Sequence, residues 1–118
     1  MIRELILAGV LSWATDYREP GSFCQPINEY ICYPLGELEV LIPDGMDRVA
    51  ECESHSVDDV VSHTGDWGRW QINYNIHIRR LDTLGITSPM ALAEPLNNWR
   101  AMMDIWLEQG FGPWSCKP

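Results

Sequence analysis

The apolar residues of this chain recur mainly at intervals of three and four positions, which is the spacing of helices that bury one face. With the turn residues that flank them, the predicted helices cover residues 2–14, 46–54, 75–84, 89–93 and 95–109. The last of these has the clearest pattern, and Gly110 follows it as a terminator. Its apolar stripe consists of Leu96, Trp99, Met102, Met103, Trp106 and Leu107.

Two short segments have the character of β-strands instead. Residues 37–42 place Leu38, Val40 and Ile42 at alternate positions, which predicts a strand. Residues 67–73 are aromatic and β-prone and predict a short hairpin. Loops are expected over 15–36, which is rich in Pro, Gly, Tyr and Cys, and over the polar stretch 55–66. The pattern therefore predicts a mainly α-helical fold with a small β-hairpin.

Composition narrows the class of protein. The 118 residues predict one domain, and the 46% apolar content with six tryptophans excludes disorder. A formal net charge of -9 argues against nucleic-acid binding, which depends on Lys and Arg neutralising phosphates. The apolar run near the N-terminus is too short to span a bilayer and resembles only a poor signal peptide. No transmembrane span is expected.

Four cysteines in a short chain predict two disulfides and an oxidising compartment. Three pairings are allowed. We prefer Cys24–Cys32, which are close neighbours, with Cys52–Cys116, which bracket the second half of the chain. The alternative is four reduced, buried thiols. Disulfides would place the protein outside the cell, in a periplasm or on a virion.

Glu53 is the first candidate for chemistry. It lies at the predicted C-terminal end of helix 46–54, where the helix dipole is negative, and Trp67 and Trp70 could supply an apolar wall. Both influences favour the neutral carboxyl group over the carboxylate. A general acid that cleaves a glycosidic bond needs that protonated form. The alternative is an ordinary exposed glutamate at the end of a helix.

Five motifs occur in order along the second half of the chain: Cys52-Glu53-Ser54, Gly-x-x-Gly-x-x-Gln-Ile-Asn over 65–73, Leu84-Gly85-Ile86, Glu-Pro-Leu-Asn-Asn-Trp over 94–99, and the segment 109–116. Together they resemble the catalytic domain of the soluble lytic transglycosylase and goose-type lysozyme group, in its compact phage and bacterial versions. The resemblance covers residues 43–118 and implies a lysozyme-like helical domain. Residues 1–42 carry no such likeness and are predicted to form an N-terminal extension of a helix, a disulfide-tied loop and a short strand.

The resemblance implies that the protein cleaves the β-1,4 bond between N-acetylmuramic acid and N-acetylglucosamine in peptidoglycan. Glu53 would be the general acid/base, and no cofactor or metal is needed. Asn97, after the acidic-Pro pair, is interpreted as structural. Aromatic rings that stack on sugars add Trp70 and Tyr74 to the predicted site. The residues predicted to bind substrate are Ser54, His55, Trp70, Gln71, Asn73, Tyr74 and Trp114.

The sequence departs from the family pattern in two places. Arg69-Trp70 precede Gln71 where the family commonly has Leu-Met or Leu-Phe, and Arg69 could alter the charge near the acid. His55 stands where Glu-Ser is usually followed by Gly, although goose-type enzymes place a histidine there. Glu51 is a rival acid, but on a helix it lies about 200° away from Glu53.

Hydrolysis with inversion needs a second carboxylate to activate water. Asp66 is the first candidate, because goose-type lysozymes carry an aspartate in a comparable loop; Asp58 and Asp59 are alternatives. Asp66 could equally be a turn residue beside Gly65. Without a base, Glu53 could serve a lytic transglycosylase, in which the 6-hydroxyl of muramic acid closes an anhydro ring.

Two non-enzymatic hypotheses stay open. One is a catalytically silent domain that binds cell wall or serves as a virion structural part, with residues 1–42 contacting a virion or cell-envelope protein. The other is a small disulfide-stabilised interaction domain. A zinc site built from His55, His63, His77 and the cysteines is disfavoured, because their spacing fits no compact Cys/His scheme.

Overall fold

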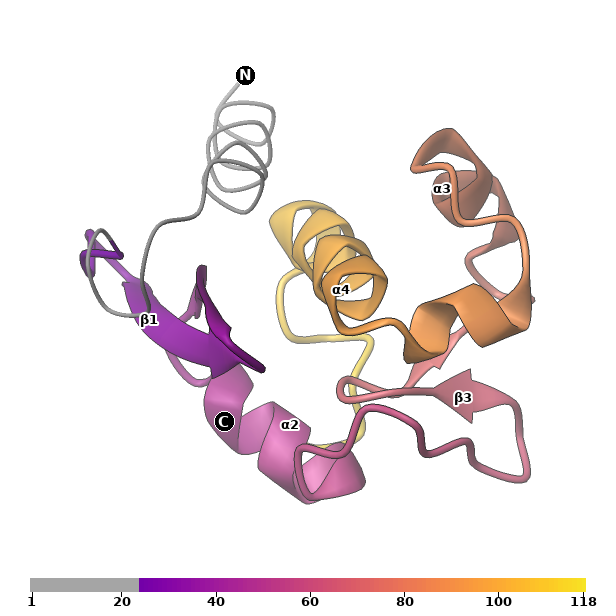
Figure 1. The fold of residues 1–118 in the computed structure, drawn as a ribbon, viewed down its shortest axis with the longest axis horizontal. Helices are drawn as coiled ribbons and strands as arrows, with labels where there is room; N and C mark the ends of the chain where they lie inside the picture. The colour runs from indigo at the N-terminus through magenta and orange to yellow at the C-terminus, as the bar shows by residue number, and fades with distance from the viewer. Residues whose placement is uncertain (1–23) are drawn as a thin grey trace.

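The computed structural model describes residues 24–118 (Figure 1). Of these residues, 37% are helical and 19% lie in strands, with three α-helices and two small antiparallel sheets. The prediction of a mainly α-helical fold is therefore wrong, and the described part of the chain has a mixed α/β fold. The helix predicted over 2–14 lies outside the described residues.

The largest difference from the sequence prediction is strand β1 (Tyr30–Leu35), which was expected to be loop. It pairs antiparallel with β2 (Leu38–Pro43), with Tyr30 opposite Pro43 and Leu35 opposite Leu38. The turn between them uses Gly36 at a φ of 64°. Pro34, which lacks an N–H, fits here because each strand of a two-stranded sheet has a free edge. The strand content is higher than predicted because this hairpin takes the place of a predicted loop.

The β1–β2 hairpin belongs to the main core. Val40, Leu41 and Ile42 are all buried, so β2 is covered on both faces and its burial does not alternate. The indole Nε1 of Trp99 donates to the carbonyl oxygen of Leu41 at 3.0 Å, which joins β2 to the last helix. The boundary predicted between residues 42 and 43 lies inside β2, and residues on both sides of it contribute to one apolar cluster.

Helix α2 (Met46–Ser54) has the predicted bounds. Gly45, at a φ of 102°, is its N-cap, and no side chain caps the helix. A Cβ at Gly45 would lie 2.5 Å from Cβ of Pro118, which shows that the C-terminus packs on the start of α2. The glycine is needed both for its conformation and for this approach.

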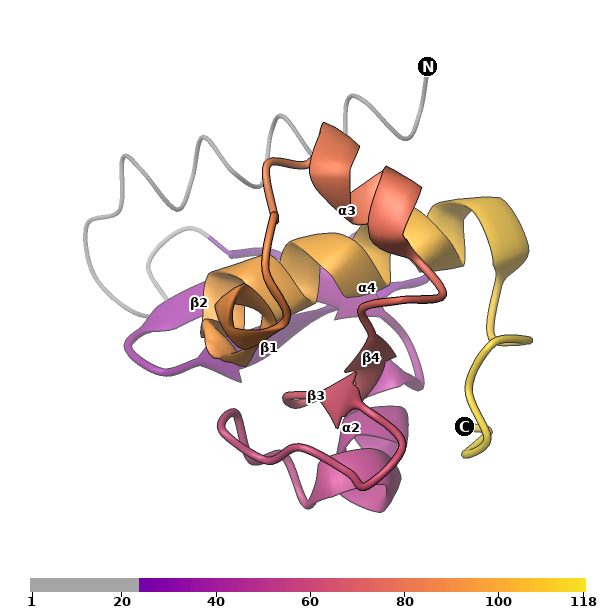
Figure 2. The same ribbon diagram turned by 90° about the vertical axis from the view of Figure 1, so that its right-hand side faces the viewer.

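Helix α4 (Pro95–Gln109) also has its predicted bounds and lies centrally, between the β1–β2 hairpin and α3 (Ile78–Thr83) (Figures 1 and 2). Tyr30 meets the Trp106 ring edge-on on the hairpin side. On the other side, Arg80 of α3 pairs with the buried Asp104 at 2.7 Å. The 3-10 helix η1 (Pro89–Ala93) precedes α4 and begins at the predicted proline.

Helix α3 is shorter than the predicted 75–84, because residues 74–77 form turns instead. Ile76 is 75% exposed and takes no part in the core. Before α3, strands β3 (Asp66–Trp67) and β4 (Ile72–Asn73) form the predicted hairpin, with Asp66 opposite Asn73. This hairpin and the end of α2 position the candidate site.

Both predicted disulfides are present. Cys24 pairs with Cys32 across a Cα–Cα distance of 5.9 Å, and Cys52 with Cys116 across 6.0 Å. The alternative of four reduced thiols is therefore wrong, and the pairs indicate an oxidising environment. Within residues 24–118, every helix is too short or too polar to cross a bilayer.

Candidate functional site

Glu53 of α2 and Asp66 of β3 line the same surface hollow. Its volume is about 300 Å³, at the lower end of the range for small-molecule sites. Of the residues predicted from sequence, the hollow brings together five: Glu53, Asp66, Gln71, Asn73 and Trp114. The rest of the lining is Ile72, Ile76, His77, Ile105, Gln109, Pro113 and Ser115.

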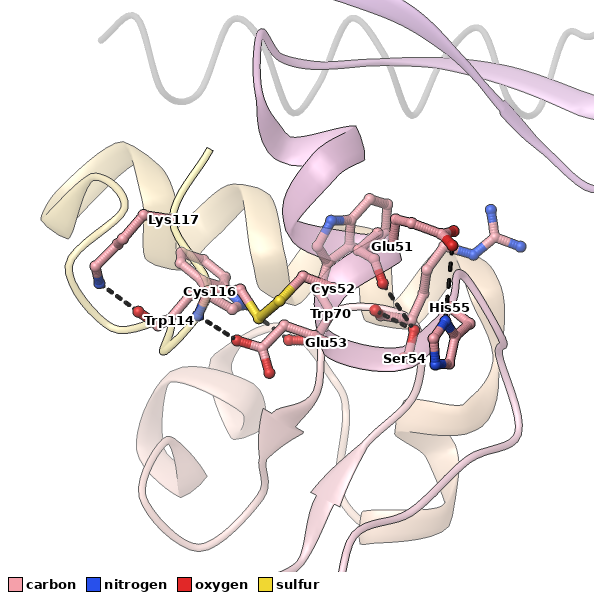
Figure 3. The surroundings of a disulfide bond; sticks show 11 residues. Glu51, Cys52, Glu53, Ser54, His55, Trp70, Trp114, Cys116 and Lys117 are labelled. Atoms are coloured by element: carbon pink, nitrogen blue, oxygen red, sulfur yellow. Dashed lines mark hydrogen bonds and ion pairs between the residues drawn. A yellow bond between two sulfur atoms is a disulfide. The ribbon is translucent and has the colours of Figure 1, made fainter.

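Glu53 lies in the last turn of α2 and is held by the C-terminal segment. Its Oε2 accepts a hydrogen bond from the backbone N–H of Cys116 at 3.0 Å. Within residues 24–118, no hydrogen bond joins its Oε1 to another residue. Figure 3 shows the Glu53 carboxyl group directed toward the C-terminal segment, whereas Glu51 leaves the helix toward His55. One carboxyl oxygen is therefore fixed and the other is available to a ligand.

The C-terminal segment forms one wall of the hollow, and three kinds of contact fix it. The Cys52–Cys116 disulfide joins it to the residue before Glu53. The Lys117 ammonium group donates to the backbone carbonyls of Phe111 at 3.2 Å, Gly112 at 3.1 Å, and Trp114. The indole of Trp114, only 5% exposed, donates to the carbonyl of Trp70 at 2.8 Å (Figure 3). The wall is thus folded on itself by Lys117 and anchored to the rest of the molecule at Trp114 and Cys116.

Asp66 begins β3 and accepts three side-chain hydrogen bonds. Thr64 Oγ1 and Ser62 Oγ donate to its Oδ2 at 2.7 and 3.0 Å, and Asn73 Nδ2 donates to Oδ1 at 3.0 Å. Partial burial acts to raise the pKa of Asp66, but these bonds and nearby His63 outweigh it and hold the pKa below its ordinary value of 3.8. Asp66 is therefore a stable anion at the rim of the hollow.

The hairpin between β3 and β4 is held in place by Asn98 of α4. Its Oδ1 accepts from the N–H of Trp70 at 2.9 Å, and its Nδ2 donates to the carbonyls of Trp67 and Leu92, both at 2.8 Å. A Cβ on Gly68 would lie 2.4 Å from Asn98 Nδ2. Asn98 is 1% exposed. The sequence analysis missed Asn98, and the signal that could have found it is a polar residue beside Trp99, next to the Asn97 that the motif identified.

Four other predicted site residues lie outside the hollow. Ser54 is buried, and its Oγ donates to the carbonyl of Arg69 at 2.6 Å, which ties α2 to the hairpin. His55 is exposed and lies 3.6 Å from Glu51. Trp70 is fully buried and donates from Nε1 to the carbonyl of Met46 at 2.9 Å. Tyr74 lines a separate shallow hollow.

Arg69 does not bring an unbalanced positive charge to the site. Its Nε and Nη2 donate to the two carboxylate oxygens of Asp58 at 2.9 and 2.8 Å, and its Nη1 donates to the hydroxyl of Tyr33 at 3.3 Å. Burial acts to lower the pKa of Arg69, but these partners raise it above its ordinary value. Asp58 is therefore committed to Arg69. Neither it nor Asp59, the other alternative base, lines the hollow.

His77 also lines the hollow. From the sequence it was considered only as a zinc ligand, and that site was disfavoured. Burial, with a smaller contribution from the positive charge of Arg80, lowers the pKa of His77 below its ordinary value of 6.5. The imidazole is therefore neutral at neutral pH, able both to donate and to accept a hydrogen bond. Among residues 24–118, no three His, Cys, Asp or Glu side chains converge as metal ligands would.

No family model, curated protein or solved structure matches this chain. The resemblance to the lytic transglycosylase and goose-type lysozyme group therefore stays a prediction that rests on short motifs.

Proposed function

We propose that this protein cleaves the β-1,4 bond between N-acetylmuramic acid and N-acetylglucosamine in peptidoglycan, with Glu53 as general acid/base. The substrate class comes from the motif resemblance. The observation that carries the proposal is that Glu53 and Asp66 line one open hollow, where Glu53 keeps one oxygen without a partner among the described residues. Paired carboxyl groups beside a groove are what glycoside cleavage uses.

The two carboxyl groups are suited to different tasks. Glu53 can present Oε1 to the glycosidic oxygen while the Cys116 N–H orients the group through Oε2. Asp66 stays negative and can stabilise the positive charge that develops on the sugar ring in the transition state. Trp114 lines the wall beside Glu53 but, being 5% exposed, supports this wall more than it contacts a sugar.

The surroundings of Asp66 favour internal attack over attack by water. A base that activates water has to accept a proton, and a carboxylate that already accepts three hydrogen bonds is a weak base. Glu53 would then act twice. It would protonate the leaving oxygen, and as a carboxylate it would take the proton of the muramic acid 6-hydroxyl as that oxygen bonds to the anomeric carbon. The product would carry an anhydro end.

The oxidising environment that the disulfides indicate agrees with an enzyme of the cell wall, and we place it outside the cell, in a periplasm or on a virion. Its net charge of -9 gives no long-range attraction to an anionic wall. We therefore propose that a virion or envelope protein delivers it by contacting part of the segment 1–42, of which Val40, Leu41 and Ile42 are buried in the core.

The test is release of soluble muropeptides from purified sacculi. Glu53→Gln should keep the fold and reduce release by about 10²- to 10⁴-fold. Glu51→Gln is the matched control, since Glu51 lies on the same helix, is exposed and faces away from the hollow. Undiminished release by Glu53→Gln would refute the assignment. A wild-type protein that pellets with sacculi but releases nothing would replace the enzyme with a wall-binding domain.

A further inference from the structure

A second hollow adjoins the Glu53 site. It has a volume of about 480 Å³ and surrounds the start of α3. It shares Ile76, His77 and Gln109 with the first hollow, so the two hollows adjoin at these residues. Beyond the shared residues, the second hollow is lined by Ile78, Arg79 and Arg80. A sugar bound at Glu53 would therefore have room for a substituent along this direction.

The second hollow differs in charge from the rest of the molecule. The chain carries a net charge of -9, yet no acidic residue lines this hollow and two arginines do. Arg80 is committed to Asp104 and Glu108. Arg79 is exposed and makes no ion pair within residues 24–118. A guanidinium group in this position offers a planar set of donors that matches a carboxylate.

Apolar side chains border the same hollow. Ile76 is 75% exposed and Ile78 is 46% exposed, although both are β-branched residues that more often lie in a core. Because they lie on either side of the neutral His77, the surface joins two apolar contacts to one cationic group. Its complement is a chain with small apolar side chains that ends in, or carries, a carboxylate.

We propose that this second hollow is a subsite for a carboxylate-bearing peptide attached to the glycan, with Arg79 pairing to the carboxylate and Ile76 and Ile78 contacting its apolar side chains. This inference rests on the proposed function, because the stem peptide of peptidoglycan is the substituent that a muramic acid bound near Glu53 would carry. It goes further by naming what distinguishes the substrate from a neutral, unsubstituted glycan such as chitin.

The kinetic test compares soluble glycan strands with and without their peptides. Because an exposed ion pair contributes at most about 1 kcal/mol, Arg79→Gln should raise KM for the peptide-bearing strand roughly 3- to 5-fold and leave kcat unchanged. KM for the peptide-free strand should not change. Arg79→Lys should restore part of the difference. Arg48→Gln, which removes an equal charge from the exposed side of α2, is the control. An equal effect on both strands, or no effect on either, would overturn the subsite.

A binding test separates this subsite from the proposed chemistry. A disaccharide-peptide and the same disaccharide without peptide are titrated into the uniformly 15N-labelled full chain at low salt. Amide shifts over residues 76–80 that appear only with the peptide, and that Arg79→Gln abolishes, would support the subsite even if the protein cleaves nothing. Identical shifts with both ligands, or none over 76–80, would refute it even if cleavage is efficient.

Discussion

The backbone N–H of Cys116 donates to Oε2 of Glu53 at 3.0 Å, and Cys116 is bonded through sulfur to Cys52, the residue before Glu53. The candidate acid is thus held by two links to the same residue, one through its own side chain and one through its neighbour. The C-terminal wall of the hollow and the orientation of Glu53 are therefore linked through one disulfide.

Loss of this disulfide should damage activity more than stability alone explains. Closing a loop of 64 residues contributes about 4 kcal/mol to the free energy of unfolding. Cys52→Ser with Cys116→Ser should lose this amount and also reduce kcat about 100-fold in the molecules that stay folded, since the wall and Glu53 would shift. Urea unfolding and muropeptide release on the same sample would measure both.

The Cys24–Cys32 pair supplies the matched control. Its loop of 8 residues contributes about 2.5 kcal/mol, and neither cysteine lines the hollow. Cys24→Ser with Cys32→Ser should therefore lower stability and leave kcat of the folded protein unchanged. Equal kcat losses in the two double variants would show that Cys52–Cys116 has no particular role in positioning Glu53.

The products should identify the attacking group. If the 6-hydroxyl of muramic acid attacks, digestion in H₂18O should give anhydro ends with no 18O, measured by mass spectrometry. Asp66→Asn should lower kcat by about 10²- to 10³-fold through loss of its negative charge, yet leave the products unchanged. One 18O atom per cleaved bond would instead identify water as the attacking group and Asp66 as its base.

His77 should make stability fall as the solution is acidified. Its pKa in the folded protein lies below 6.5, so the unfolded chain binds a proton first. The free energy of unfolding should therefore decrease as pH drops from 6.5 toward the pKa of the folded state. His77→Gln should show a shallower decrease. Thermal unfolding of both proteins between pH 8 and pH 5 would test this, and the two slopes should coincide above pH 7.5. Equal slopes below pH 6.5 would contradict the lowered pKa.

Gly68→Ala should destabilise the fold far more than Gly65→Ala. Both glycines have positive φ, 76° and 85°, so both variants bear a conformational cost of about 1 kcal/mol. Only at Gly68 would the new Cβ meet Asn98 Nδ2 and the Leu92 carbonyl oxygen, at 2.4 and 2.8 Å. We expect Gly68→Ala to cost about 2 kcal/mol more than Gly65→Ala in urea unfolding. Equal costs would show that Asn98 moves aside freely.

Local signals predicted the parts of the fold that depend on local chemistry. Helices α2 and α4 were predicted with their observed bounds, because their apolar spacing and terminal glycines are properties of the segments themselves. The two disulfides followed from cysteine spacing. Strand β1 was missed because Pro34 and an irregular burial pattern hide it, and its stability depends on pairing with β2 and packing on α4.

The candidate site was predictable only in part, for the same reason. Motif order brought out Glu53, Asp66, Gln71, Asn73 and Trp114, which share the hollow. Motif order could not indicate that Asp58 forms an ion pair with Arg69, since that pair joins separate loops. Nor could it place His77 in the hollow, because the turns over 74–77 replaced the start of the predicted helix.

The contact between Gly68 and Asn98 also bears on how relatives of this protein can be found. Asn98 occupies the space that any side chain at position 68 would need, and in return it satisfies the backbone on both sides of that position. A side chain at position 68 therefore requires a change at position 98, and a change at position 98 removes the hydrogen-bond partner of Trp67 and Trp70. Among chains too divergent for overall similarity to be detected, a retained glycine-asparagine pair at this separation would be a practical marker of common ancestry.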